Sequence, residues 1–113
     1  MSEQSVTVCD VYTDELKIGL CNGTVLLVDV REPHEFSAGR IPSALSMPLS
    51  VFEADDLPFE QGKRVIFSCR TGVRSIQALK LAQQAGLKIT DHYKPGFVGW
   101  VNDGGDVESD LKN

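Results

Sequence analysis

Runs of apolar residues separated by polar, helix-like segments recur along the whole chain. Two of these runs are rich in β-branched residues and almost uninterrupted, which is typical of strands covered on both faces of a parallel sheet. Three weaker runs predict further strands, and a proline near each end limits one of them to a short or edge strand. In chain order the predicted strands are Val6–Val11, Thr24–Val30, Ile41–Met47, Lys63–Ser68 and Leu87–Tyr93.

Segments with helical spacing and helix start signals lie between these strands. Glycine follows several of them, as is common just beyond the end of a helix. The alternation of strands and helices predicts an α/β fold, with a parallel sheet of about five strands and helices on both faces. The predicted helices run over residues 13–20, 33–36, 50–54, 72–85 and 97–101, and Trp100 is expected to cover an edge of the core.

Size and composition fit one domain with one core. The chain has 113 residues, of which 42% are hydrophobic. We expect a single domain over residues 1–113, with a short polar and loose tail from about residue 103. The formal net charge of −5 argues against nucleic acid as a partner, because nucleic-acid-binding proteins concentrate Lys and Arg on one face.

No targeting or membrane signal is evident in the sequence. The apolar runs are far shorter than the roughly 20 residues that span a bilayer, and no basic-then-apolar leader opens the chain. Three cysteines without a CxxC pair indicate neither a disulfide framework nor a metal site. We therefore expect a cytoplasmic protein that has no membrane partner and binds no metal.

The three cysteines have different surroundings in the sequence. Cys9 and Cys21 have no neighbouring acid, base or second cysteine, and both are expected to be buried packing residues. Cys69 instead follows a predicted buried strand and precedes a predicted helix. At such a position, unpaired backbone N–H groups and the helix dipole favour an anion, and the thiolate is therefore expected over the thiol.

The residues after Cys69 reinforce that expectation. Arg70 and Arg74 add positive charge, and Thr71 and Ser75 can add hydroxyl donors. Gly72 allows backbone conformations that other residues resist, which helps the loop amides point inward. Val73 is expected at the mouth of the loop, where its apolar side chain can tune which substrate enters. Cys69 is therefore the candidate nucleophile, and Arg70, Thr71, Gly72, Val73, Arg74 and Ser75 are the candidate substrate-binding residues.

The sequence resembles the rhodanese family of sulfurtransferases from about Val6 to Val107. The order and spacing of four motifs agree with a single-domain member. They are Leu27-Val28-Asp29-Val30-Arg31-Glu32 with Glu35-Phe36, Gly39-Arg40-Ile41-Pro42-Ser43-Ala44, Cys69-Arg70-Thr71-Gly72-Val73-Arg74-Ser75 and Gly96-Phe97-Val98-Gly99-Trp100.

The resemblance implies a two-step covalent reaction. Cys69 takes the outer sulfur of a donor such as thiosulfate, becomes a persulfide, and passes the sulfur to a thiophilic acceptor such as cyanide. The loop amides would hold the persulfide, while Arg70 and Arg74 attract the anionic donor. No metal or organic cofactor is implied. The resemblance equally allows glutathione persulfide or a protein persulfide as the donor, and a protein partner in sulfur relay.

Residues outside the loop receive supporting or structural interpretations. Asp29 and Arg31 match an acidic and basic pair of the family and are expected to position the neighbouring loop. His34 is expected on an exposed helix and His92 in the last strand, and neither is a candidate base. The chain departs from the common family pattern where Arg40 replaces histidine, Ser43 replaces glycine, and Pro95 replaces the first of two glycines.

Two other functions compete with sulfur transfer. Some phosphatases and arsenate reductases share this fold and a similar cysteine loop, but they place one residue more between the cysteine and its arginine than the four residues present here. The shorter loop suits a sulfur atom better than a tetrahedral phosphate. A binding or regulatory module without turnover is the other alternative, and the intact Cys69 argues against it.

Overall fold

A parallel sheet organises the part of the chain that the computed structural model describes, residues 5–58 and 62–111. Its strands follow the spatial order β1-β5-β4-β2-β3, and every neighbouring pair is parallel. The predicted α/β class is therefore confirmed. The strands are β1 (Cys9–Val11), β2 (Val25–Asp29), β3 (Leu45–Ser46), β4 (Arg64–Ser68) and β5 (Asp91–Tyr93).

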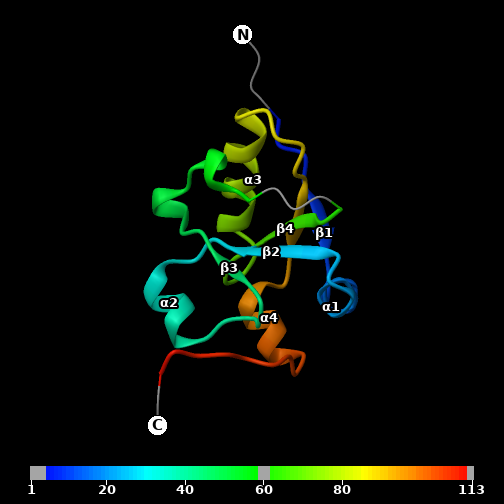
Figure 1. Cartoon of the computed structure of the whole chain (residues 1–113), viewed down its shortest axis with the longest axis vertical. Coiled ribbons are helices and arrows are strands. Elements are labelled where there is room, and N and C mark those ends of the chain that lie inside the picture. The colour runs from blue at the N-terminus through cyan, green and yellow to red at the C-terminus, as the bar shows by residue number, and fades with distance from the viewer. Residues whose placement is uncertain (1–4, 59–61, 112–113) are drawn as a thin grey trace.

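Helices cover both faces of the sheet, as the alternating pattern predicts. Side chains of α1 and α4 pack against one face, and those of α3 pack against the other. Figure 1 shows α3 above the strands and α1 and α4 below them in that view. The helices are α1 (Thr13–Asn22), α2 (Pro33–Ala38), α3 (Arg74–Gln84) and α4 (Gly96–Asn102), with 3₁₀ turns η1 (Leu49–Val51) and η2 (Ala54–Asp56).

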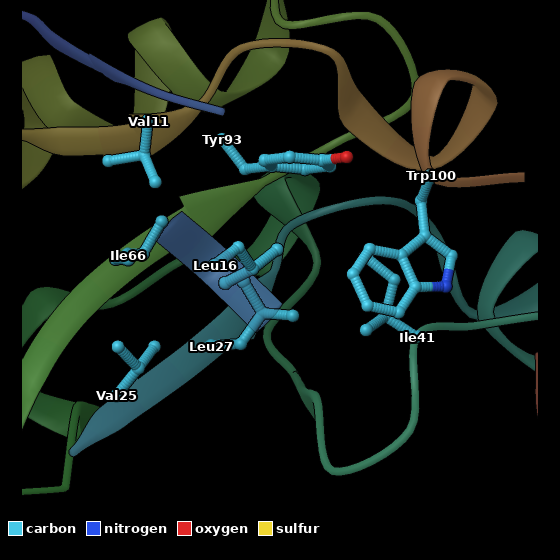
Figure 2. Close-up of a cluster of buried hydrophobic side chains, with 8 residues drawn as sticks. All are labelled: Val11, Leu16, Val25, Leu27, Ile41, Ile66, Tyr93 and Trp100. Carbon is cyan, nitrogen blue, oxygen red and sulfur yellow. The ribbon is translucent and has the colours of Figure 1, made fainter. Parts of the chain in front are cut away.

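The two central strands form the core because both of their faces are buried. On one face, Leu27 and Ile66 pack with Leu16 of α1, as Figure 2 shows. Trp100 of α4 closes this cluster and meets the ring of Tyr93 edge-on at a centroid distance of 6.3 Å. Trp100 thus covers the core as predicted. Burial of side chains on both faces explains why β2 and β4 read as continuous apolar runs.

The predicted strands at residues 6–11 and 87–93 are too long. Only their last three residues pair in the sheet. The Gln83 side chain of α3 binds the backbone N–H and C=O of Thr7 and also the C=O of Ile89. A side chain thus satisfies backbone groups that a longer ladder would have paired.

Two further predicted elements differ from the structure. The strand predicted over residues 41–47 reduces to β3, which pairs with the end of β2 only. Its position between two prolines and at the sheet edge accounts for this short length. The helix predicted over residues 50–54 is replaced by the two 3₁₀ turns η1 and η2.

Cys9 and Cys21 are exposed, so their predicted burial is wrong. Cys9 begins β1 at the edge of the sheet. Cys21 lies in the last turn of α1, whose buried residues are Thr13, Leu16 and Gly19. Cys21 is out of phase with that three-residue spacing and therefore faces solvent.

The segment after α4 is mostly exposed, but it is not the loose tail that its polarity predicts. Glu108 and Arg40 exchange two backbone hydrogen bonds in an antiparallel bridge, and the Asp110 amide donates to the Ser37 carbonyl. Arg40 also binds the Asp110 carboxylate at 2.8 Å. The segment therefore lies along the end of α2. Within residues 5–58 and 62–111, none of the helices has the length and apolar character of a membrane-spanning segment.

Ser43 has a backbone φ of 76°, the left-handed conformation that favours glycine. We expect Ser43→Gly to raise the free energy of unfolding by about 0.5–1 kcal/mol, because the strain of a side chain in this conformation is removed. Urea denaturation would measure the change. Ser46→Gly in β3 is the control and should lower stability. A Ser43→Gly variant no more stable than the parent would contradict the prediction.

Candidate active site

Cys69 follows the last residue of β4 and lies at the carboxyl end of the sheet, where loops lead into helices. Its side chain is almost fully buried, with 1% of the residue exposed. The Gly72 amide donates a hydrogen bond to Sγ at 3.1 Å, and Sγ lies 3.5 Å from the Ser75 hydroxyl oxygen. The loop therefore folds around the sulfur atom, and donors converge on it.

These donors change the acidity of the thiol. Burial by itself would raise the pKa of Cys69, but hydrogen bonds from the Ser75 hydroxyl and from the amides of Ser75, Thr71 and Gly72 outweigh it. The net result is a Cys69 pKa below that of an ordinary thiol. The helix α3 begins immediately after the loop, and the positive end of its dipole also favours the thiolate. The site thus favours a nucleophilic sulfur.

A second segment supports the loop from behind. The Phe97 amide donates to the Cys69 carbonyl at 2.8 Å, and the Val98 amide donates to the Arg70 carbonyl at 3.1 Å. Gly96 has a φ of 68°, and a Cβ atom there would lie 2.3 Å from the Arg70 oxygen. Gly72 is similarly constrained, since its Cβ would lie 2.5 Å from the Lys94 oxygen. Two backbones can approach this closely only because both positions are glycine.

The two loop arginines have different environments. Arg70 is exposed, and no ion pair to it is found among the described residues. Arg74 instead binds Glu35 of α2 through two hydrogen bonds of 2.7 and 3.0 Å. The Arg74 guanidinium lowers the pKa of Glu35 to about 2. Arg74 therefore ties the start of α3 to α2, while Arg70 keeps its charge available at the surface.

Asp29 and Arg31 form a buried ion pair at the end of β2, with an N···O distance of 2.7 Å. The Arg31 guanidinium also donates to the Gly39 carbonyl at 2.7 Å and lies over the Phe97 ring at 4.4 Å. The pair thus connects β2, the end of α2 and α4. This placement accords with the predicted positioning role, which stays a prediction.

The mouth of the loop exposes Thr71 and Val73, the latter with 63% of its surface accessible. The donor to Sγ from Thr71 is its amide and not the predicted hydroxyl. The Ser75 hydroxyl contacts the sulfur atom, but the hydrogen bond runs from the thiol to the serine oxygen, so the predicted donor role applies to the thiolate alone.

Sequence reasoning missed three polar residues near the loop. Glu35 binds Arg74, as described above. His92 lies in β5 as predicted, but its Nδ1 lies 2.7 Å from the Ser75 hydroxyl, and its Nε2 lies 2.7 Å from an Asp10 carboxylate oxygen. Side-chain alternation in β1 and β5 would have placed Asp10 and His92 on one face of the sheet only if the register of these distant strands had been known.

A pocket of about 560 Å³ lies beside the loop. Charged residues, Glu35 among them, line it together with mainly apolar ones. Its lining includes Arg31, Arg70, Phe97, Val98, Val101 and Val107. A second pocket, of about 300 Å³, is lined by Leu57, Arg64 and Leu87, near the beginning of β4 and therefore at the opposite end of that strand from Cys69.

Comparison with known proteins places these features in context. A family model described as "Rhodanese-like domain" matches residues 12–103. "Thiosulfate:glutathione sulfurtransferase" of Saccharomyces cerevisiae is 35% identical over 102 residues, and the match covers 79% of this chain and 73% of that protein. "Uncharacterized protein slr1261" of Synechocystis sp. is 39% identical over 80 residues, and the match covers 71% of this chain but only 45% of that relative.

Solved structures agree with the sequence comparisons. The structure described as "Human Single Domain Sulfurtranferase TSTD1" superposes with a TM-score of 0.70 at 28% sequence identity. The match covers 88% of this chain and 97% of that one.

Gly96→Ala should lower the free energy of unfolding by at least about 2 kcal/mol more than Gly86→Ala does, because only the first introduces a backbone clash. Gly86 is the matched control, since it has a φ of 89° with no atom within 4 Å of an added Cβ. Gly96→Ala should also slow the alkylation of Cys69. Urea denaturation and mass spectrometry would measure both effects. Equal costs for the two variants would contradict the close approach at Gly96.

Glu35→Gln should lower the free energy of unfolding at pH 7, because it removes the ion pair with Arg74. The loss should be about 1–2 kcal/mol, since the pair is partly exposed to solvent. The parent's advantage should be complete above pH 4.5 and disappear as the pH falls to about 2, since the folded-state pKa lies below the ordinary value. Denaturation at several pH values would test this. Glu53→Gln, at an exposed carboxylate, is the control. A stability difference between the parent and Glu35→Gln that does not change with pH would contradict a stabilising ion pair between Glu35 and Arg74.

Proposed function

The chain belongs to the family of rhodanese-like domains, and on that basis we propose that it transfers sulfane sulfur from a small anionic donor through a persulfide on Cys69. The observation that carries this proposal is the convergence of hydrogen-bond donors on Sγ, which lowers the pKa of the thiol. Relatives named as sulfurtransferases support the same class of reaction.

In the first step, we propose that thiosulfate is the donor. The Cys69 thiolate attacks the outer sulfur of thiosulfate, forming a new S–S bond while the old one breaks and its electron pair leaves with sulfite. The negative charge passes from Sγ to the outer sulfur of the persulfide. Amides of the loop are suited to hold that charge, and the exposed Arg70 is suited to attract the dianionic donor.

In the second step, a thiophilic acceptor takes the outer sulfur. Cyanide would leave as thiocyanate, and a thiolate would leave as a new persulfide, and in both cases Cys69 returns to the thiolate. The pocket beside the loop combines the exposed Arg70 with apolar residues, which suits a small thiol that carries a carboxylate. Arg31 and Glu35 also line it, and each is already paired with another side chain. The name of the yeast relative gives glutathione as a substrate of that protein, and we propose a thiol of this class as the acceptor.

The proposed cycle needs neither a metal nor an organic cofactor, because both steps are nucleophilic substitutions at sulfur. The persulfide could equally be delivered to a partner protein in a sulfur relay. A regulatory module without turnover and a cysteine-dependent phosphatase are the competing functions. The phosphatase is disfavoured by the four residues between Cys69 and Arg74.

Incubation with thiosulfate should add one sulfur atom to the intact chain, and cyanide or glutathione should then remove it. Cys69→Ser should abolish the gain, because the other two cysteines lack the donors that surround Cys69. Intact-mass spectrometry would follow each step, and Cys21→Ser is the matched control that should still gain sulfur. Failure of the parent to gain sulfur from thiosulfate or from glutathione persulfide would overturn the proposal and favour the binding module.

A further inference from the structure

His92 is a buried titratable residue that the proposed sulfur transfer does not use. None of its surface is exposed, and both ring nitrogens have polar partners. Most residues on this face of the sheet are apolar and pack under α3. A histidine in that position needs a physical account, because burying a polar ring costs free energy unless its hydrogen bonds are made.

The sheet register explains how the side chains of Asp10, His92 and Ser75 meet. Asp10 of β1, His92 of β5 and Phe67 of β4 are neighbours in one row across the parallel strands. Side chains of one row point to the same face, and here that face carries α3. Ser75 in the first turn of α3 therefore lies above His92, with a distance of 2.7 Å between Oγ and Nδ1.

Together these contacts form a continuous chain of hydrogen bonds from the sulfur atom toward the surface. Sγ of Cys69 lies 3.5 Å from the Ser75 hydroxyl, which contacts His92, which contacts the Asp10 carboxylate. The first three residues are buried, whereas 39% of the Asp10 side chain is accessible. This series of hydrogen bonds thus links an almost inaccessible thiol to solvent.

The protons that each group carries determine which atom donates in each of these hydrogen bonds. A carboxylate only accepts, so His92 donates from Nε2 to Asp10. In the neutral imidazole, Nδ1 must then accept the Ser75 hydroxyl proton, which leaves the serine oxygen to accept from the Cys69 thiol. If Nδ1 carries a proton, it donates to the Ser75 oxygen, and the serine hydroxyl is free to donate to the thiolate. The two arrangements exclude each other.

We propose that His92 is a positioning residue that couples the ionisation of Cys69 to its own protonation through Ser75. When the thiol ionises, its S–H bond breaks as a proton passes to the Ser75 oxygen. The serine's own proton passes to Nδ1 of His92. The products are a thiolate that accepts the serine hydroxyl and an imidazolium held by Asp10, with no change in total charge and no redox step.

Other charged groups near His92 do not offer a competing partner. Lys80 of α3 is exposed, and the remaining charged groups on the elements packed against His92 are engaged in ion pairs. Those pairs are Arg64 with Asp91 and Arg74 with Glu35. The coupled groups are therefore Cys69, His92 and Asp10.

The direct test compares the charge of the His92 ring in two states of the parent chain. ¹⁵N NMR of the imidazole should report an imidazolium while Cys69 is a thiolate. At the same pH, it should report a neutral ring after Cys69 is blocked with iodoacetamide. The signal of the exposed His34 is the internal control and should not change. An unchanged His92 charge in the two states would overturn the proposal.

Variants supply a second, independent test through the rate at which iodoacetamide alkylates Cys69, followed by site-resolved mass spectrometry across pH. Ser75→Ala and His92→Phe should each lower the rate at pH 7 by about tenfold or more, because the thiolate loses a charge-assisted donor. The double variant should lose little more than either single one. His92→Asn should restore much of the rate, since its amide can donate to Ser75.

His34→Asn is the matched control on an exposed helix and should leave the rate within about twofold of the parent. If folded His92→Phe and His92→Asn react alike, His92 only fills space, and the proposal fails. The inference concerns the same Cys69 as the proposed function. Its readouts are alkylation and NMR, and the absence of sulfur transfer from thiosulfate would therefore not be mistaken for absence of the coupling.

Discussion

The close approach of two backbones beneath Cys69 is the constraint on which the reactive loop depends. Gly72 and Gly96 each bring a Cα within van der Waals contact of a carbonyl on the opposite segment. This contact allows the amides of Phe97 and Val98 to bind the loop carbonyls. With its carbonyls held from behind, the loop turns its N–H groups toward Sγ, where they stabilise negative charge. The chemistry of one sulfur atom thus rests on packing between main chains.

Sequence patterns predicted the parts of the fold that burial alone determines. The runs around β2 and β4 are apolar because both faces of the sheet are covered, and the match is good there. Predictions failed where a side chain replaced a backbone partner, as Gln83 does beside β1 and β5. They also failed where an apparently loose polar segment found a partner across the fold, as Glu108 does with Arg40. Such contacts depend on tertiary position and leave no local pattern.

The candidate site divides in the same way. Cys69 and its loop are contiguous, so their motif and their place between a strand and a helix could be identified in the sequence. The pair of Arg74 with Glu35 and the chain from Ser75 to Asp10 join segments that are far apart in sequence. Their formation depends on strand register, and one step of register would turn His92 away from α3. The sequence gives no sign of the polar partners of His92, because they are distant from it in the chain.

The strand order has a consequence for how the protein is made. β1 lies at the edge of the sheet and pairs with β5, and the loop after β4 is held by residues 94–98, which the ribosome adds after β4 itself. Contacts of such long sequence separation form late and slowly. During synthesis, β1 and the loop after β4 therefore both lack their partners until residues 91–98 have been added. Until then, the carbonyls of Cys69 and Arg70 lack the amides of Phe97 and Val98 that hold the loop in its folded conformation.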